Sequence, residues 1–239
     1  MTDQPQNPDE LDLTALPGGE QDIIGALPPA LAACLAHAKR VIFIANNPAI
    51  CASDIDALQL SEADIVVSFN TCIKYDLLQQ SPVNVFVHGF NAPDQYFFGL
   101  PYRPEIQQLF YENGHRCFTL LVGCAAPMSA VPGVMLLRER IPLPALWNYP
   151  VQRPNGKRFV GPSTGFNAMV LLSAVRERLG YGYQLFALGF SNEAGKLWGG
   201  HAWDYEREWL LRSDVESLAL KTPHRVTFFA RLKKLIRGR

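Results

Sequence analysis

The stretch FVGPSTGFNAMVLLSAVRERLGYGYQLFALGF, residues 159–190, decides the fold class of this chain. Its middle part, 165–179, repeats apolar residues at helical spacing, which predicts an amphipathic helix. The run QLFALGF (184–190) is short and almost entirely apolar, as is typical of a strand buried on both faces. A helix that leads through a brief turn into such a strand indicates an α/β fold. The apolar helix positions are Phe166, Met169, Val170, Leu172 and Val175.

Similar apolar runs recur on both sides of this stretch, and helical patterns accompany them at 27–40 and 202–211. Strands that alternate with helices predict a Rossmann-like three-layer α/β/α fold with a mainly parallel sheet. The further predicted strands are VIFIAN (41–46), DIVVSFN (64–70), NVFVHGF (84–90), HRCFTLLVG (115–123), the segment 134–138 and VTFFA (226–230).

The chain divides into an arm, one domain and a tail. Residues 1–20 are rich in Pro, Gly, Asp and Gln, which predicts a disordered arm. Residues 21–223 form the α/β domain, in which the Pro-rich stretch 127–162 is expected to be a long functional loop or lid. The tail, 224–239, has six Arg or Lys residues interleaved with apolar ones. Such a tail either rests on an anionic membrane surface or docks with its basic face in solvent.

Composition excludes several classes of protein. The 239 residues carry a formal net charge of zero, so no overall positive field attracts nucleic acid. The five cysteines are odd in number and none forms a Cys-x-x-Cys pair, which disfavours a zinc site or a disulfide framework and fits a reducing cytosol. The polar, acidic start is unlike a signal peptide, and no apolar run is long enough to span a membrane. We expect a cytoplasmic protein.

Polar residues follow several of the predicted strands. In parallel sheets, ligands bind beyond the carboxyl ends of the strands, so these residues are expected to surround one cleft. The amide of an Asn can both donate and accept hydrogen bonds, and therefore can read a base, a ribose or a phosphate; the alternative is that it caps a turn. The residues concerned are Asn46, Asn47, Asn70, His88, Gly89 and Ser191.

The turn GPSTG (161–165) opens the predicted helix and provides a second candidate site. Ser163 or Thr164 can cap the helix, Gly165 permits close approach of a ligand, and free N–H groups at a helix start suit a phosphate. Ordinary capping is the competing interpretation. The chain contains neither Gly-x-Gly-x-x-Gly nor a phosphate-binding P-loop sequence, which disfavours a dinucleotide-binding enzyme and a P-loop NTPase.

The segment GGHAWDYE (199–206) contains the candidate catalytic residues His201 and Glu206. His201 suits proton transfer near a bound anion, and Glu206 either orients it or complements a helix dipole. Packing among aromatic residues is the alternative for His201. Lys196, in the preceding loop, either neutralises a leaving phosphate or is a solvated surface lysine.

Taken in order, these segments resemble the sialyltransferases, namely the animal-type family with its L, S and VS sialylmotifs (glycosyltransferase family 29), and more loosely the small bacterial enzymes. VIFIANNPA with IDALQLSEADIVVSFN looks like the L motif, GPSTGFNAM with YQLFALGF looks like the S motif, and HAWDYE fits the His-x4-Glu VS motif. The likeness covers roughly residues 41–75 and 159–211.

The resemblance implies a GT-A-like fold variant and an inverting, metal-independent transfer of sialic acid or a related ulosonic acid such as Kdo. The donor would be a CMP-sugar, and the acceptor a glycan or glycolipid. His201 would be the general base, with Glu206 beside it. It implies further that Asn46 and Asn70 contact the CMP moiety and that Ser163, Thr164 and Gly165 line the nucleotide or phosphate side. By their positions in the chain, Asn47, Ser191 and Lys196 complete the expected CMP-sugar site.

Two departures from the family pattern matter. The S-like region lacks the cysteine of the animal enzymes, which fits a bacterial cytosolic protein. If the tail rests on an anionic membrane, the protein is peripheral on the inner membrane. The loop SNEAGKLWGG (191–200) lacks the tyrosines that hold the leaving phosphate in small bacterial relatives. A catalytically inactive CMP-binding module of the same fold is therefore the alternative function.

No metal is expected, since the nearest acidic string, Asp54-Ile55-Asp56, lies in the L-like turn.

Overall fold

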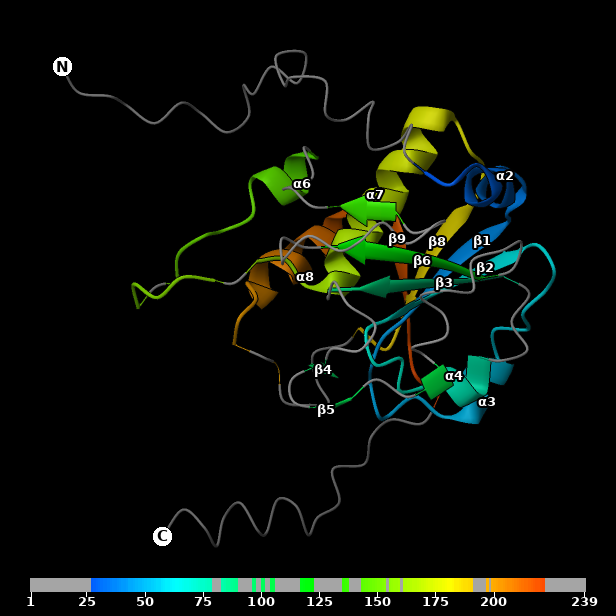
Figure 1. The fold of residues 1–239 in the computed structure, drawn as a ribbon, viewed down its shortest axis with the longest axis horizontal. Coiled ribbons are helices and arrows are strands. Elements are labelled where there is room, and N and C mark those ends of the chain that lie inside the picture. The colour runs from blue at the N-terminus through cyan, green and yellow to red at the C-terminus, as the bar shows by residue number, and fades with distance from the viewer. Residues whose placement is uncertain are drawn as a thin grey trace, which may run out of the picture.

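The structure is a computed structural model of the chain, and it describes an α/β unit with one large sheet (Figure 1). The described residues are 27–78, 83–89, 96–97, 100–101, 104–105, 117–122, 135–137, 143–153, 155–159, 161–190, 197 and 199–221. The strands are β1 (Arg40–Ile44), β2 (Asp64–Phe69), β3 (Val83–His88), β4 (Tyr96–Phe97), β5 (Leu100–Pro101), β6 (Cys117–Val122), β7 (Met135–Leu137), β8 (Gln184–Leu188) and β9 (Val215–Leu218). The helices are α2 (Pro29–His37), α3 (Ala52–Asp56), α4 (Tyr75–Leu78), α6 (Pro144–Trp147), α7 (Thr164–Leu179) and α8 (Trp203–Arg212).

Seven strands form the main sheet in the order β7-β6-β3-β2-β1-β8-β9, and every neighbouring pair is parallel. In the register at the centre, Val41 lies opposite Ile65 on one side and Leu185 on the other. The short strands β4 and β5 pair separately and antiparallel. The prediction of a Rossmann-like parallel sheet is confirmed.

Alternation along the strands builds two hydrophobic cores. Val41 and Phe43 of β1 belong to the core that also contains residues of α2, α6, α7 and α8. Ile42 and Ile44 point to the opposite face and pack with residues of α3 and α4. Helices thus cover both faces of the sheet, and Figure 1 shows α3 and α4 on the side away from α2 and α7. Two buried faces explain why the strands are apolar without interruption.

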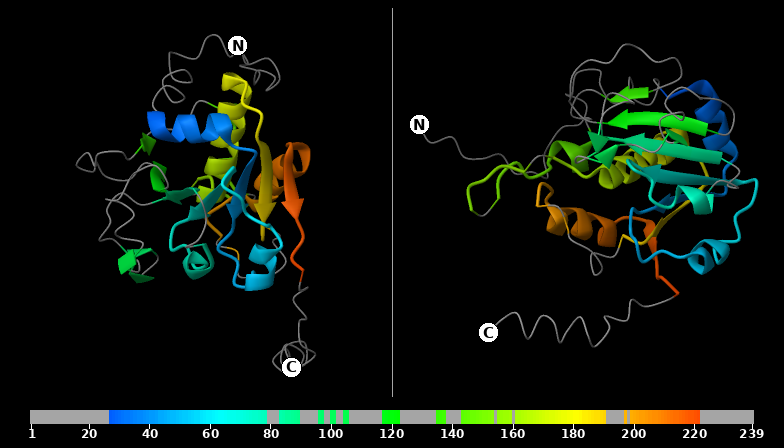
Figure 2. Two further views of the ribbon diagram at one scale, coloured as in Figure 1. Left: turned by 90° about the vertical axis from the view of Figure 1, so that its right-hand side faces the viewer. Right: turned by 60° about the horizontal axis from the view of Figure 1, so that its bottom comes forward.

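Helix α7 begins and ends at recognisable capping residues. The Ser163 hydroxyl accepts a hydrogen bond from the N–H of Phe166, and Gly180 ends the helix with a φ of 65°. The helix packs over β2 and β3 and has its N-terminus at the carboxyl edge of the sheet, where Thr164 reaches Asn70. Helix α8 lies beside it (Figure 2), and the Phe166 and Trp209 rings meet edge to face at 5.2 Å.

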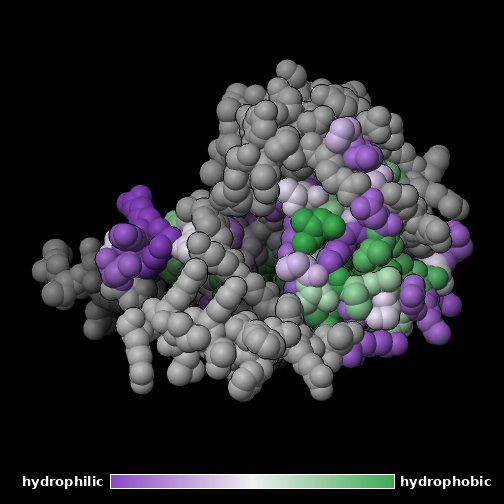
Figure 3. Space-filling model, turned by 90° about the horizontal axis from the view of Figure 1, so that it is seen from below, coloured by the Kyte–Doolittle hydropathy of each residue, from purple (hydrophilic) through white to green (hydrophobic). Residues whose placement is uncertain are grey.

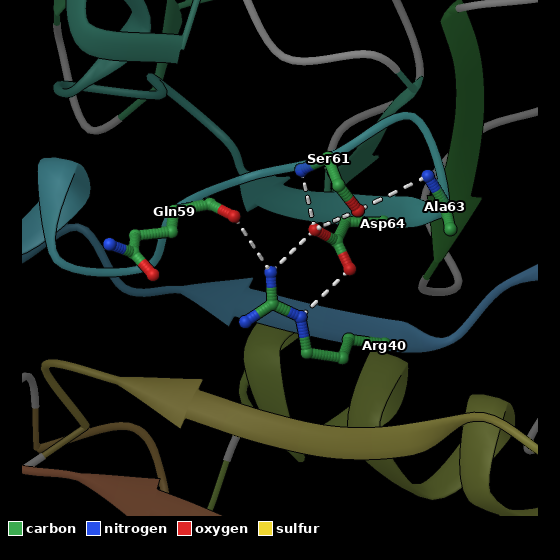
Figure 4. Close-up of polar contacts among 5 residues, drawn as sticks. All are labelled: Arg40, Gln59, Ser61, Ala63 and Asp64. Carbon is green, nitrogen blue, oxygen red and sulfur yellow. Dashed lines mark hydrogen bonds and ion pairs between the residues drawn. The ribbon is translucent and has the colours of Figure 1, made fainter.

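An ion pair fastens the opposite, amino-terminal edge of the sheet (Figure 4). Arg40 opens β1 and donates from Nε and Nη2 to the two carboxylate oxygens of Asp64, at 2.8 and 2.5 Å. Asp64 opens β2 and also accepts from the backbone and hydroxyl of Ser61. Burial alone would raise the pKa of Asp64, but these hydrogen bonds outweigh it and the pKa is lowered. The cluster lies at the end of the strands away from the candidate site and has a structural role.

The predicted elements within the described residues are present, with shifts of a few residues at their ends. The segment 127–162, expected to be a loop or lid, contains β7, α6 and a small hairpin at 151–159. Strand β9 is an addition to the prediction. The arm 1–20, the tail 224–239 and the expected strand 226–230 lie outside the described residues. None of the helices that the structure describes is long and apolar enough to cross a membrane.

Candidate functional site

The candidate site lies where the order of the strands reverses. Successive strands run outward from β1 through β2, β3 and β6 to β7, and then β8 returns to the free side of β1. Ligands of parallel sheets bind at such a switch point, beyond the carboxyl ends of the strands. Asn47 bridges it, because its Nδ2 donates to the carbonyl of Gly189 after β8, at 2.9 Å.

Asn46 and Asn47 hold the loop after β1 in place. Asn46 Nδ2 donates to the carbonyl of Phe69 at 2.7 Å, and its Oδ1 accepts from the N–H of Ile73 at 3.1 Å. The buried Asn47 also accepts from the N–H of Ala49. Both amides therefore tie the ends of neighbouring strands together, and of the two only Asn46 is exposed to solvent.

Asn70 joins three elements at the centre of this edge. Its backbone is left-handed, with a φ of 49°, and its Oδ1 accepts from the N–H of Gly89 after β3, at 2.8 Å. Its Nδ2 donates to the Thr164 hydroxyl at 3.1 Å. A Cβ at Gly89 would lie 3.1 Å from that hydroxyl oxygen, so glycine permits the close contact. The structure thus brings Asn70 and Thr164 together.

Gly165 has a packing role in the first turn of α7. A Cβ there would lie 2.8 Å from the ring of Phe190, which follows β8. The space that the sequence pattern assigned to an approaching ligand is therefore filled by an aromatic ring. Phe190 in turn meets Phe69 edge to face at 5.9 Å.

The carboxylate of Glu206 is bound to the N-terminus of α7. Glu206 Oε1 accepts from the N–H of Ser163 at 2.8 Å and from the hydroxyl of Tyr149 at 2.7 Å, and Oε2 accepts from the Ser163 hydroxyl at 2.6 Å. Tyr149 Oη also accepts from the N–H of Ala202 at 2.6 Å. Glu206, on α8, therefore fixes α7 and the segment before His201.

Electrostatics fit this network. Burial raises the pKa of Glu206, and the hydrogen bonds from Ser163 and Tyr149 offset part of that effect. Burial, followed by the neighbouring Glu206 charge, raises the pKa of Tyr149, so the phenol remains a hydrogen-bond donor. The carboxylate occupies the position at the helix start where an anion is stabilised by the helix dipole. Both hydrogen-bond donors of Ser163, the N–H and the hydroxyl, are engaged by it.

His201 is held by a backbone carbonyl. Its Nδ1 lies 2.7 Å from the carbonyl oxygen of Gly161, and since a carbonyl only accepts, Nδ1 carries the proton of this bond. In the neutral ring, Nε2 is then the basic nitrogen. Burial lowers the pKa of His201 although the Gly161 bond acts against this, so the ring is neutral at pH 7. Trp203 packs edge to face on it at 5.1 Å.

Sequence reasoning overlooked three residues of this region. Gly161 and Tyr149 orient His201 and Glu206, and Arg153 lies beside the loop that precedes His201. The lack of any acidic residue in 141–163 was the one available signal for Arg153.

His88, expected to face the cleft, is fully buried at the end of β3, and burial lowers its pKa to about 3. Ser191 and Lys196 lie outside the described residues.

Ligands for a metal ion do not gather in the part of the chain that the structure describes: no three His, Cys, Asp or Glu side chains there could hold one. Asn70 and Thr164 form a pair of neutral hydrogen-bonding groups at the start of α7, and His201 is held by Gly161, three residues before Thr164. Groups of these kinds can bind a polar ligand and, at the imidazole ring, accept a proton from it.

Comparison with known proteins links part of the chain to a glycosyltransferase. The chain is 32% identical over 117 residues to a glycogen synthase of Leptothrix cholodnii (strain ATCC 51168 / LMG 8142 / SP-6). The match covers 47% of this chain, and the chain spans 23% of that enzyme's length. No family model matches the chain. No solved structure matches it.

Proposed function

We propose that this chain is an inverting glycosyltransferase that moves sialic acid or a related ulosonic acid from a CMP-sugar to a hydroxyl of a glycan or glycolipid, without a metal ion. The fixed orientation of His201 carries the proposal. A general base must be neutral at the working pH and must present its basic nitrogen to the substrate. The Gly161 bond leaves Nε2 as the basic nitrogen and the lowered pKa favours the neutral ring, and both observations support the proposal.

The chemical step follows from this orientation. His201 Nε2 accepts the proton of the acceptor hydroxyl while its oxygen bonds to the anomeric carbon. The bond from that carbon to the phosphate oxygen breaks, and CMP leaves with the electron pair. Attack from the face opposite to CMP inverts the anomeric configuration. Proton transfer of this kind contributes about 10²–10⁴-fold in rate.

The nucleotide is assigned to the edge formed by Asn46, Asn70 and Thr164. Glu206 takes the N–H of Ser163, whereas the N–H groups of Thr164 and Gly165 in the first turn have no acceptor within the helix and favour a phosphate. Ser163 and Glu206 then act as positioning residues, because the two donors of Ser163 are hydrogen-bonded to the Glu206 carboxylate. The similarity to a glycogen synthase supports glycosyl transfer in general, and the order of the sialylmotif-like segments supports a CMP-sugar donor.

The test is calorimetric titration of the full chain with CMP, with UMP, ADP and AMP as controls, each with and without EDTA. We expect CMP to bind at least tenfold more tightly than the others, with no effect of EDTA. Binding should be followed by release of CMP from CMP-sialic acid or CMP-Kdo. Preference for UMP or ADP would leave glycosyl transfer in place and overturn the CMP-sugar donor.

A catalytically inactive CMP-binding module is the second candidate. The observation that favours it is the internal use of the polar groups, since Asn47, Asn70 and Ser163 all hydrogen-bond within the chain. It predicts selective CMP binding without turnover of any CMP-sugar. Cleavage of one CMP-sugar that is lost in His201→Ala would exclude it.

A further inference from the structure

The hairpin at 151–159 places a cation beside the loop that leads to His201. Gln152 and Arg158 pair as an isolated bridge, and the N–H of Arg153 donates to the carbonyl of Lys157 at 2.7 Å. In Figure 1 the hairpin projects from the left side of the molecule, and Figure 3 shows hydrophilic side chains gathered at that end. The turn therefore holds the backbone of Arg153 in one conformation.

The guanidinium of Arg153 is oriented by packing. Its Cζ lies 5.3 Å from the centre of the Phe159 ring, and its Nη1 lies 3.8 Å from where a Cβ on Gly199 would be. Gly199 is two residues before His201. Within the described residues, Arg153 Nε is buried without a hydrogen-bond acceptor, and no carboxylate there forms an ion pair with this side chain. Arg153 as a whole is half-buried, and a half-buried guanidinium without an acceptor is costly, which points to an anion that binds it.

The segment that contains Arg153 carries only positive charge. The segment 141–163 contains three cations and no Asp or Glu. On the neighbouring α8, Asp204 pairs with Arg207 at 3.0 Å, and Glu206 is bound to Ser163 and Tyr149. The acidic side chains of α8 closest to His201 in sequence are thus already engaged, and the hairpin retains its positive charge.

The contacts along this edge give the position of Arg153 relative to the nucleotide. Asn70 contacts Thr164 at the start of α7, and Gly161, three residues earlier, contacts His201. Arg153 lies beside Gly199, two residues before His201. If the nucleotide lies at Asn70 and the reacting hydroxyl at His201, Arg153 faces the remainder of the acceptor.

We infer that Arg153 binds a carboxylate or phosphate group of the acceptor, which is therefore an acidic glycan or a phosphorylated sugar. This inference rests on the proposed function. The planar guanidinium, stacked on Phe159, offers two parallel N–H groups that match either anion. Because a neutral sugar leaves the guanidinium without a partner, the site selects against neutral acceptors.

The experiment is saturation-transfer NMR on the full chain, with and without CMP, using glucose, glucuronic acid and glucose 6-phosphate as probes. We expect glucuronic acid or glucose 6-phosphate to bind at least tenfold more tightly than glucose, and the better of the two identifies the anion. Arg153→Gln should weaken that probe about tenfold. Arg158→Gln, an exposed cation of the same hairpin, is the matched control and should leave it unchanged. Arg153→Lys keeps the positive charge but lacks the two parallel N–H groups of the guanidinium, so its affinity for the probe should lie between those of the wild type and Arg153→Gln.

Several outcomes overturn the inference. One is equal binding of glucose and the acidic probes. Another is an equal loss of probe affinity in Arg153→Gln and Arg158→Gln, because this would mean that the overall positive charge of the hairpin attracts the probe and not Arg153 itself. Thermal unfolding of each variant shows whether it is folded. If Arg153→Gln does not fold, Arg153→Lys takes its place in the binding test. Selective CMP binding with no acidic-probe binding rejects this inference alone. Acidic-probe binding through Arg153 without CMP binding rejects the proposed function, and with it the assignment to an acceptor.

Discussion

Ser163 donates two hydrogen bonds to one carboxylate, that of Glu206: its N–H to Oε1 at 2.8 Å and its hydroxyl to Oε2 at 2.6 Å. The two residues are 43 positions apart, at the start of α7 and within α8. The same hydroxyl accepts from the N–H of Phe166 and so caps α7. One carboxylate thus fixes the helix start that borders the candidate nucleotide site and, through Tyr149, the backbone next to His201.

Removal of this carboxylate should destabilise the fold. Glu206→Ala leaves the Ser163 N–H and the Tyr149 hydroxyl buried without an acceptor, and we expect a loss of about 2–4 kcal/mol in the free energy of unfolding. Glu206→Gln retains an acceptor oxygen and should cost about 1 kcal/mol. Urea unfolding measures both. Equal stability of Glu206→Ala and the wild type would contradict the network.

Substitution of His201 should affect turnover and spare nucleotide binding. His201→Ala is expected to lower kcat by about 10²–10⁴-fold, because it removes the general base. The dissociation constant of CMP should change less than about threefold, since the assigned nucleotide groups lie at Asn70 and Thr164. A variant with full transfer activity would exclude His201 as the base.

The pH dependence of transfer tests the same residue. A base acts in its neutral form, so lowering its pKa moves the acid limb of kcat/KM to lower pH. Because burial lowers the pKa of His201, the half-maximal point should lie below the ordinary value of 6.5. Measurement of kcat/KM between pH 4.5 and 8 gives the limb. An acid limb above 6.5 would contradict the buried position of His201.

His88 should make the protein less stable in acid. Burial lowers its folded pKa to about 3 from 6.5, so between these values the unfolded chain binds a proton that the folded chain does not. Stability therefore falls as pH falls through this window, by up to about 1.4 kcal/mol per pH unit from this residue. The slope in His88→Gln, measured by urea unfolding at pH 5 and 6, should be shallower. An unchanged slope would show that His88 is protonated in the folded state.

Gly165 should tolerate no side chain. In Gly165→Ala the new Cβ would meet the Phe190 ring at 2.8 Å, and we expect a loss of about 1–3 kcal/mol although Ala favours a helix. Gly182→Ala is the matched control, because a Cβ there meets nothing within 4 Å, and it should change stability by less than about 0.5 kcal/mol. The double variant Gly165→Ala, Phe190→Leu should recover part of the loss. Additive losses would mean that Phe190 is not the obstacle.

Local patterns predicted most of the fold. The strands buried on both faces appear as apolar runs, and α7 was predicted from apolar spacing and from the turn before it, where Ser163 is the cap. Strand β9 escaped prediction because it lies at the edge of the sheet, where Glu216 and Ser217 are exposed and break the apolar pattern. The short helices α3, α4 and α6 have too few residues to show a period.

By itself, the sequence determined the α/β class, the main alternation of strands and helices, and the edge of the sheet at which Asn46, Asn47 and Asn70 lie, because these depend on local periodicity and on the geometry of parallel sheets. The tertiary structure alone decided the partners: Glu206 with Ser163, His201 with Gly161, Phe190 over Gly165, and Arg153 beside Gly199. Such contacts join segments 25 to 46 positions apart, and they depend on how α7, α8 and the hairpin pack together, which no short stretch of sequence encodes.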